Sequence, residues 1–319
     1  MDNSKRNYLS LSRLHPPLLF VVALMGLLAV VSLAGVLFDD RILFGVPIWE
    51  KPLKFSLSFM LYGGVIAALI PLMTRHRRLA GAFGWVIAVS WLAEMGLITM
   101  QVVRGTSSHF NGATEFDGMV FTLMGVSIAV LWFANLGLAV LSWIYRFGDR
   151  AVTWSIRAGV VVSMAGALVG GMMIGPRDNL AEDMIGAHSV GVPDGGEVIP
   201  FLGWSATGGD LRIGHFVGLH ALQVLPLLAL WLGHRAARGS RWLADERSRL
   251  RVVGVATLAY VGLTVLVIWQ AMRAEPLLRP SGLVIAAALG LVAATAAGVW
   301  WAVRTPRRSR ALVSEGVTE

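Results

Sequence analysis

The chain has 319 residues, of which 56% are hydrophobic and only 14% are charged, and it contains no cysteine. Its mean hydropathy of +0.68 and its repeated apolar runs, long enough to cross roughly 30 Å of hydrocarbon, predict a polytopic membrane protein. The lack of cysteine excludes disulfides, iron–sulfur clusters, thiolate metal sites and haem attached through cysteine. Basic loops beside anionic lipid explain the net charge of +8, so we predict no nucleic-acid partner.

Eight apolar segments predict an all-α bundle of about eight transmembrane helices, which forms a single integral membrane domain over residues 1–319. The predicted spans cover residues 16–38, 52–73, 80–103, 118–145, 153–175, 211–233, 251–272 and 281–303. The first is too long for a signal peptide core, so we expect a retained helix. Lys and Arg stay cytoplasmic during insertion. Nineteen of the 27 lie in ends and loops on one side, which places both termini in the cytoplasm.

The second predicted span begins with polar residues at its outer end. It opens with Trp49, Glu50, Lys51, Pro52, Leu53 and Lys54. Proline suits the first helical turn, and the start of a helix is electropositive. Lys54 lies one turn inside the helix. It either extends to the membrane surface or pairs with Glu94 and orients an anionic group.

Glu94 is the feature of the third predicted span that points to a site. It precedes Arg104, which marks the outer end of the span, by ten residues, so it lies roughly 15 Å below that end. A carboxyl group in hydrocarbon is costly and usually faces a cavity, a partner or a substrate path. Steps of three and four residues put Trp91, Ile98 and Gln101 on the same helix face.

Polar and aromatic residues continue into the next loop and span. The loop from Arg104 to Asp117 contains His109 and Phe110 and can cap a cavity beside Glu94. Trp132 lies deep in the fourth span and is a second candidate aromatic wall. Asn135, also deep, has the sequence context of a residue that bridges helices.

The only long loop covers residues 175–210 and is expected outside the cell. It mixes acidic residues with apolar ones, Trp204 among them, and ends at Asp210. It is either a solvated linker or a lid that folds back over the site.

The sixth predicted span carries a group of polar side chains in its outer half. Arg212 and Gln223 lie almost in line on the helix, and His215 and His220 flank that line over about 140°. His220 lies ten residues beyond Asp210, at a depth similar to that of Glu94.

Glycines and an aromatic residue lie between these polar side chains. Gly214 and Gly218 permit a close helix approach or leave room for a ligand. Phe216 lies between them and completes the candidate binding residues of this span.

An acid in an apolar, aromatic cavity keeps its proton and can act as a general acid, while tryptophan faces stabilise carbocations. In size, span number and acid-in-bundle layout, the chain resembles the small integral-membrane terpene cyclases of bacterial and fungal meroterpenoid or diketopiperazine pathways. The resemblance is architectural and implies cyclisation of a lipophilic isoprenoid without a cofactor. From the residues we predict Glu94 as proton donor, with His220 and Asp210 as further catalytic residues. The predicted substrate-binding residues are Trp49, Glu50, Lys54, Trp91, Gln101, Arg104, His109, Phe110, Trp132, Trp204, Arg212, His215, Phe216 and Gln223.

Two other classes of function fit parts of the same pattern. In one, His215 or His220, with His109 or His188, ligates haem b, or a set made of His109, His215, His220 and Glu94 binds another metal. In the other, intramembrane Glu and His form the proton relay of a coupled transporter. The sequence leaves the substrate and the oligomeric state open.

Overall fold

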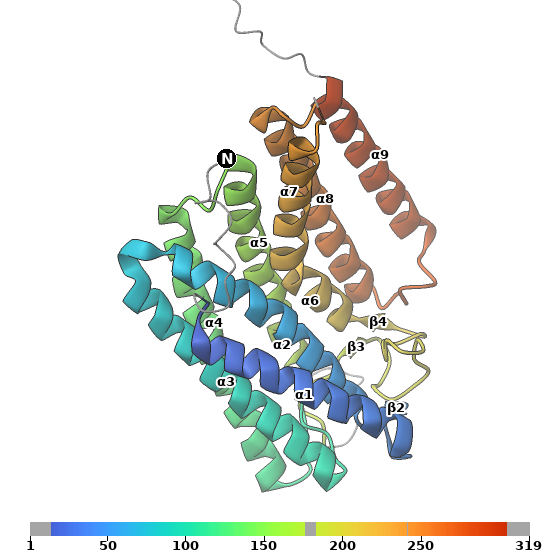
Figure 1. Ribbon diagram of the computed structural model, residues 1–319. Coiled ribbons are helices and arrows are strands. Elements are labelled where there is room, and N and C mark those ends of the chain that lie inside the picture. The colour runs from blue at the N-terminus through green and yellow to red at the C-terminus, as the bar shows by residue number, and fades with distance from the viewer. Residues whose placement is uncertain (1–13, 176–182, 241, 305–319) are drawn as a thin grey trace, which may run out of the picture.

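A computed structural model describes residues 14–175, 183–240 and 242–304, and this part of the chain is largely helical (Figure 1). The helices are α1 (Pro16–Phe38), α2 (Glu50–Leu69), α3 (Arg77–Arg104), α4 (Glu115–Ile144), α5 (Arg150–Val169), α6 (Leu211–Leu219), α7 (Ala221–Ala237), α8 (Glu246–Met272) and α9 (Gly282–Arg304). Three short 3-10 helices cover Ile70–Leu72, Thr74–His76 and Gly170–Met173. The predicted all-α bundle is confirmed.

Seven of the described helices are long and apolar enough to cross a membrane, and the bent pair of α6 and α7 gives an eighth candidate span. These helices coincide with the eight predicted spans to within a few residues. The chain ends, at residues 1–13 and 305–319, lie outside the described residues, as do residues 176–182 of the long loop.

Local sequence explains where the helices begin and end. Pro16 and Pro17 open α1, where a missing N–H costs nothing. Thr114 caps α4 by accepting from the N–H of Asp117 at 3.1 Å, and Asp210 caps α6 by accepting from the N–H of Arg212 at 3.0 Å. Such caps satisfy backbone donors that a helix leaves unpaired.

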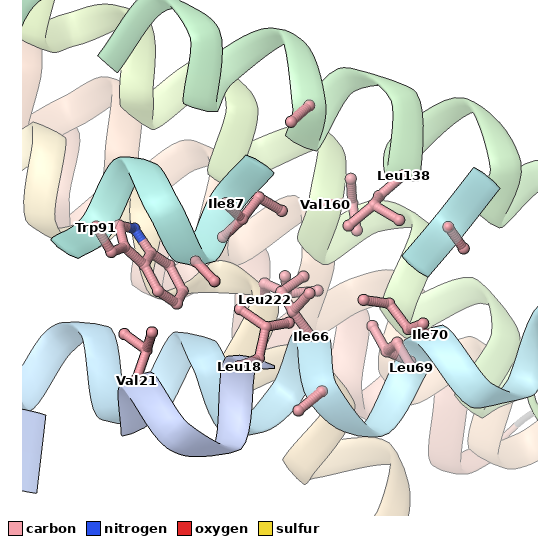
Figure 2. Packing of buried hydrophobic residues seen from close by; sticks show 14 of the residues in the cluster. Leu18, Val21, Ile66, Leu69, Ile70, Ile87, Trp91, Leu138, Val160 and Leu222 are labelled. Atoms are coloured by element: carbon pink, nitrogen blue, oxygen red, sulfur yellow. The ribbon is translucent and has the colours of Figure 1, made fainter. Parts of the chain in front are cut away.

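The main core lies where the first four helices meet α5 and α7. Figure 2 shows Leu18 of α1, Ile66 of α2 and Leu222 of α7 directed toward one another, with Trp91 of α3 at the edge of the group. Helix α9 packs on α8 at the rim of the molecule (Figure 1). Of its residues, Val284 and Ala302 are buried.

The predicted sixth span is broken rather than continuous. Helices α6 and α7 meet at His220 with a bend of 41°. Before the bend, Gly218 is pressed against Gly166 of α5, because a Cβ on Gly166 would lie 2.6 Å from the Gly218 Cα. After it, Pro226 lacks the N–H that the Leu222 carbonyl would accept. The predicted close approach of helices at Gly218 is confirmed.

The segments at residues 39–49, 105–114, 174–175, 183–210 and 273–281 lie at one end of the bundle, here called the long-loop end (Figure 1). Two antiparallel pairs of short strands form there, β1 (Ile42–Leu43) with β2 (Val46–Pro47), and β3 (Ser189–Val190) with β4 (Gly209–Asp210). The N–H of Gly112 donates to Asp183 O at 2.8 Å. The N–H of Ala187 donates to Met173 O at 3.0 Å. The described part of the long loop is therefore fastened across the bundle.

Candidate functional site

Glu94 lies in α3 with its side chain fully buried, at 0% exposure. Neither of its carboxyl oxygens has a hydrogen-bond partner among the described residues. The Ser127 hydroxyl lies nearby, but it donates to the carbonyl oxygen of Ser90 at 3.3 Å. A buried polar group without a partner costs free energy and therefore calls for an explanation beyond packing.

The face of α3 that carries Glu94 is buried along its length, as the sequence predicted. Trp91, Ile98 and Gln101 are each no more than 2% exposed. The Trp91 ring stacks on Phe59 of α2 with centroids 4.8 Å apart, and the edge contact with Tyr62 measures 5.9 Å. Glu94 thus lies one turn along the helix from an aromatic group.

Lys51 supplies the positive charge that acts on Glu94. It lies in the first turn of α2, half-buried, and interacts electrostatically with Arg212, Asp194 and Glu94. The structure gives it no hydrogen bond or ion pair with any described residue. Its sequence neighbour Lys54 is different, because it pairs with Glu50 and donates to Leu202 O at 2.5 Å. Lys54 therefore ties α2 to the long loop and does not reach Glu94.

Lys51 acts electrostatically on two histidines from separate loops, His109 and His188, and His215 acts on His109. Burial, together with the positive fields of Lys51, His188 and His215, holds the pKa of His109 well below its usual value. The His109 ring contacts Phe55 of α2 at a centroid distance of 5.9 Å. Its neighbour Phe110 is buried with a left-handed backbone, φ 58°, an uncommon conformation for a bulky residue. The Phe110 carbonyl accepts from the N–H of Ile185 at 2.9 Å.

Asp194 of the long loop fixes His188. The His188 Nδ1–H donates to Asp194 Oδ2 at 2.7 Å, and the N–H of Ser189 donates to Oδ1 at 2.8 Å. Although burial opposes it, these bonds hold the pKa of Asp194 well below its usual range. Burial and Arg212 keep the pKa of His188 below 6.5 despite the carboxylate. The imidazole is therefore neutral at pH 7, with its Nε2 lone pair unused by Asp194.

Asp210 and Arg212 form a second fixed pair at the start of α6. The Arg212 guanidinium donates to both oxygens of Asp210, with Nη2 at 2.5 Å from Oδ2. The same Nη2 donates to Gly203 O at 2.6 Å, and Asp210 also accepts from the N–H of Ser205 at 2.8 Å. One turn on, His215 Nδ1 donates to Gly166 O at 2.8 Å. Asp210 therefore holds the arginine and the loop rather than lying free.

A separate network joins α3 to α4. Gln101 Nε2 donates to Asp117 Oδ1 at 2.8 Å, and Arg104 donates to the same oxygen at 2.5 Å. Thr114 donates to the other oxygen at 2.6 Å. Gln101 and Arg104 thus fix the helix pair at the long-loop end.

The remaining predicted residues are dispersed over the fold. Trp49 Nε1 donates to Asp39 at 2.7 Å, and Trp132 Nε1 donates to Met164 O at 3.4 Å. Phe216 lies between the rings of Trp204, 6.2 Å away, and His220, 4.3 Å away.

His220 and Asn135 contact other residues than those around Glu94 and Lys51. The Gln223 side chain lies beside the His220 ring without hydrogen-bond geometry. The charge that reaches Glu94 comes from Lys51 rather than from His220. Asn135 accepts from the Tyr62 hydroxyl at 3.0 Å, so its predicted role as a bridge between helices is confirmed.

The structure thus brings Glu94, His109, Arg212 and His215 into one region, together with Lys51, His188 and Asp194. Sequence analysis gave Lys51 no role and did not select Asp194. The sequence feature that could have identified Lys51 is its position beside Pro52, in the first turn of a predicted helix. Nothing in the Gly/Pro-rich stretch around Asp194 indicated its partner.

No protein-family model matches the chain, and neither a curated protein nor a solved structure does. Among the described residues, no group of three or more His, Asp or Glu side chains is arranged to hold a metal ion. The function must therefore be inferred from the chemistry of the residues themselves.

Proposed function

We propose that the chain is a membrane-embedded enzyme that cyclises a lipophilic isoprenoid substrate by protonating it, with Glu94 as the proton donor. The observation that carries this proposal is the fully buried Glu94 carboxyl group, which has no hydrogen-bond partner among the described residues. A structural carboxyl at this depth would be expected to bind a donor or a cation directly. A carboxyl group without such a partner can give its proton to a bound substrate.

The aromatic residues near Glu94 support the same chemistry. Trp91 lies one turn before Glu94 and stacks on Phe59. Aromatic faces attract cations within about 6 Å, and protonation of an alkene generates a carbocation. Lys51 supports a different step, because a positive charge that acts on Glu94 stabilises the carboxylate left after proton transfer.

The proposed setting is the cell membrane, with the long-loop end facing outward. Seven long apolar helices and one bent pair support a multi-pass arrangement. The basic loops at the opposite end favour the cytoplasm for that end. The site would then open toward the extracytoplasmic half of the bilayer.

A histidine-ligated metal or haem b is the second candidate. His188 donates its Nδ1–H to a carboxylate, and His215 donates to a backbone carbonyl. Partners of this kind orient metal-binding histidines and leave the Nε2 lone pair available. This candidate ranks second because the described residues hold no group of ligands arranged around one point. A stoichiometric metal or a haem absorption band in the purified protein would reverse the order.

The experiment that tests the leading proposal compares three forms of the protein in membranes. Wild type, Glu94→Gln and Glu94→Asp are incubated with farnesyl- and geranylgeranyl-substituted phenols and their terminal epoxides, and products are separated by mass spectrometry. The wild type should yield a product isomeric with its substrate. Glu94→Gln should lose at least 100-fold in turnover, since general acid catalysis contributes about 10²–10⁴-fold. Turnover by Glu94→Gln at the wild-type rate would reject the donor role.

A further inference from the structure

Aromatic rings form a continuous line of contacts from α3, through α2, to the loop between α3 and α4. The Trp91 ring stacks on Phe59 with centroids 4.8 Å apart. Phe59 contacts Phe55, one turn along α2, with centroids 5.9 Å apart, and Phe55 contacts the His109 ring at the same centroid distance of 5.9 Å. The line therefore joins the aromatic group beside Glu94 to an imidazole at the long-loop end.

The same contacts relate the position of His109 to that of Glu94. Helices α2 and α3 run in opposite directions and pack against each other (Figure 1), and Phe59 and Trp91 mark one level of that contact. Toward the long-loop end, Phe55 follows four residues along α2, a rise of about 6 Å. Glu94 follows three residues along α3 on the face that carries Trp91, a rise of about 4.5 Å. Phe55 and Glu94 therefore lie at nearly the same depth, and His109 contacts the chain at that level.

The loop holds His109 with one ring nitrogen engaged. Ser108 Oγ lies 3.1 Å from His109 Nδ1, and the Ser107 hydroxyl donates to the carbonyl oxygen of His109 at 2.9 Å. The Nε2 atom makes no hydrogen bond to any residue that the structure describes, and the side chain is half-buried rather than enclosed. Burial holds the pKa of His109 well below its usual value. When Nδ1–H donates to Ser108, the neutral ring presents an open lone pair on Nε2.

We propose that His109 is the base that ends the cyclisation, by taking a proton from the last carbocation. This role rests on the proposed function. A C–H bond beside the cationic carbon breaks, its electron pair forms the alkene of the product, and the proton moves to His109 Nε2. The imidazolium then releases this proton to water at the long-loop end. Glu94 takes up another proton before the next turnover, so the reaction consumes none.

The rings between the acid and the base suit the steps that come between protonation and deprotonation. Phe55 and Phe59 lie along the line that leads from Trp91 to His109. Aromatic faces attract a cation within about 6 Å. The positive charge can thus pass from the protonated end of the substrate to its last position while it stays beside an aromatic ring.

The test compares the products of His109→Gln and His109→Phe with those of the wild type. Membranes are incubated with a farnesyl-substituted phenol, and products are identified by mass spectrometry. Neither replacement is a base, but His109→Phe keeps a ring beside Phe55. In both variants the rate of forming the wild-type product should fall by about 100-fold or more. Substrate consumption should fall far less, because Glu94 still protonates the substrate, and alkene isomers and a water adduct should replace the product.

His76→Gln is the matched control. His76 is also half-buried, and its Nδ1 lies 2.8 Å from a hydroxyl, that of Tyr145. It lies in the turn between α2 and α3, at the end of the bundle opposite the long loop. The variant therefore removes a comparable imidazole far from the line of rings and should form the wild-type product.

The outcomes separate this proposal from the proposed function. The wild-type product from both His109 variants, at the wild-type rate and with unchanged melting temperatures, would overturn the role of His109 and leave that of Glu94 intact. The wild-type product from His109→Phe alone would show that the ring acts by packing, which also overturns the proposal. If the wild type cyclised no substrate, or if Glu94→Gln turned over normally, the proposed function itself would fail and the role of His109 with it.

Discussion

The charge of Lys51, in the first turn of α2, acts on Glu94 in the interior of α3. The two residues come from helices that pack against each other, yet no hydrogen bond or ion pair joins them. Lys51 can therefore stabilise the Glu94 carboxylate electrostatically without occupying its oxygens as a hydrogen-bond donor.

Replacing Glu94 by an apolar residue should stabilise the protein. Glu94→Leu removes a buried group without hydrogen bonds, whose burial costs about 1–3 kcal/mol. Gln101→Leu on the same buried face is the matched control. Gln101→Leu should destabilise the protein, because it removes the hydrogen bond that the Gln101 amide donates to Asp117. Thermal unfolding in detergent checks both variants, and a lower melting temperature for Glu94→Leu would show that Glu94 has a structural partner.

Acidification below pH 6.5 should destabilise the fold. The pKa values of His109 and His188 lie below 6.5 in the folded state, so the unfolded chain binds protons that the folded chain does not. Above pH 6.5 both histidines are neutral in the folded and the unfolded chain, and the free energy of unfolding is at its full value. As the pH falls from 6.5 toward the lowered pKa values of the folded state, the free energy of unfolding decreases by at most about 1.4 kcal/mol per pH unit for each histidine. Melting temperatures at pH 7.5 and 5.5 measure the effect. His109→Gln should reduce the difference, and an equal or larger difference would contradict the assignment.

The contact between α5 and α6 should not tolerate a side chain. A Cβ on Gly166 would lie 2.6 Å from Gly218 backbone atoms, whereas one on Gly96 of α3 would have no heavy atom within 4 Å. Gly166→Ala should therefore cost about 1–3 kcal/mol through overpacking. Gly96→Ala should be neutral or stabilising, since alanine favours helix. Equal melting temperatures for the two variants would mean that the helices are further apart.

The orientation can be tested by cysteine labelling, because the sequence has no cysteine. Ala113→Cys lies in the exposed α3–α4 loop, and Ala237→Cys lies at the exposed end of α7. A membrane-impermeant maleimide applied to intact cells should label the first variant and should reach the second only after permeabilisation. The reverse pattern would place the long-loop end in the cytoplasm.

Most of the fold could be predicted because a membrane span follows from hydropathy and length. The first predicted span coincides with α1, Pro16–Phe38. The break at His220 was not predicted, since a proline and two glycines in a helical pattern do not show which residue of a neighbouring helix will press against them. Gly166, the residue that does so, lies 52 positions before Gly218 in the chain.

The candidate site could be predicted only in part. A lone Glu in an apolar run is visible in the sequence, so Glu94 and its helix face were identified. Depth along a helix does not determine neighbours, however. His220 has a depth similar to that of Glu94, but the charge acting on Glu94 is that of Lys51 from another helix. Asp194 could not be anticipated, because its partner His188 depends on the path of an irregular loop.

Deuterium incorporation during turnover of an alkene substrate, one without the terminal epoxide, tests the central claim most directly, because an epoxide would take the proton on oxygen and not on carbon. Protonation by Glu94 adds one solvent-derived hydrogen to a substrate carbon, and a later loss of a proton from another carbon makes the product isomeric with the substrate. In D₂O, the cyclised product should carry one deuterium on a carbon whose hydrogen does not exchange, and Glu94→Gln should form none of this product. A cyclised product without deuterium, or one formed equally by Glu94→Gln, would contradict acid-initiated cyclisation by this residue.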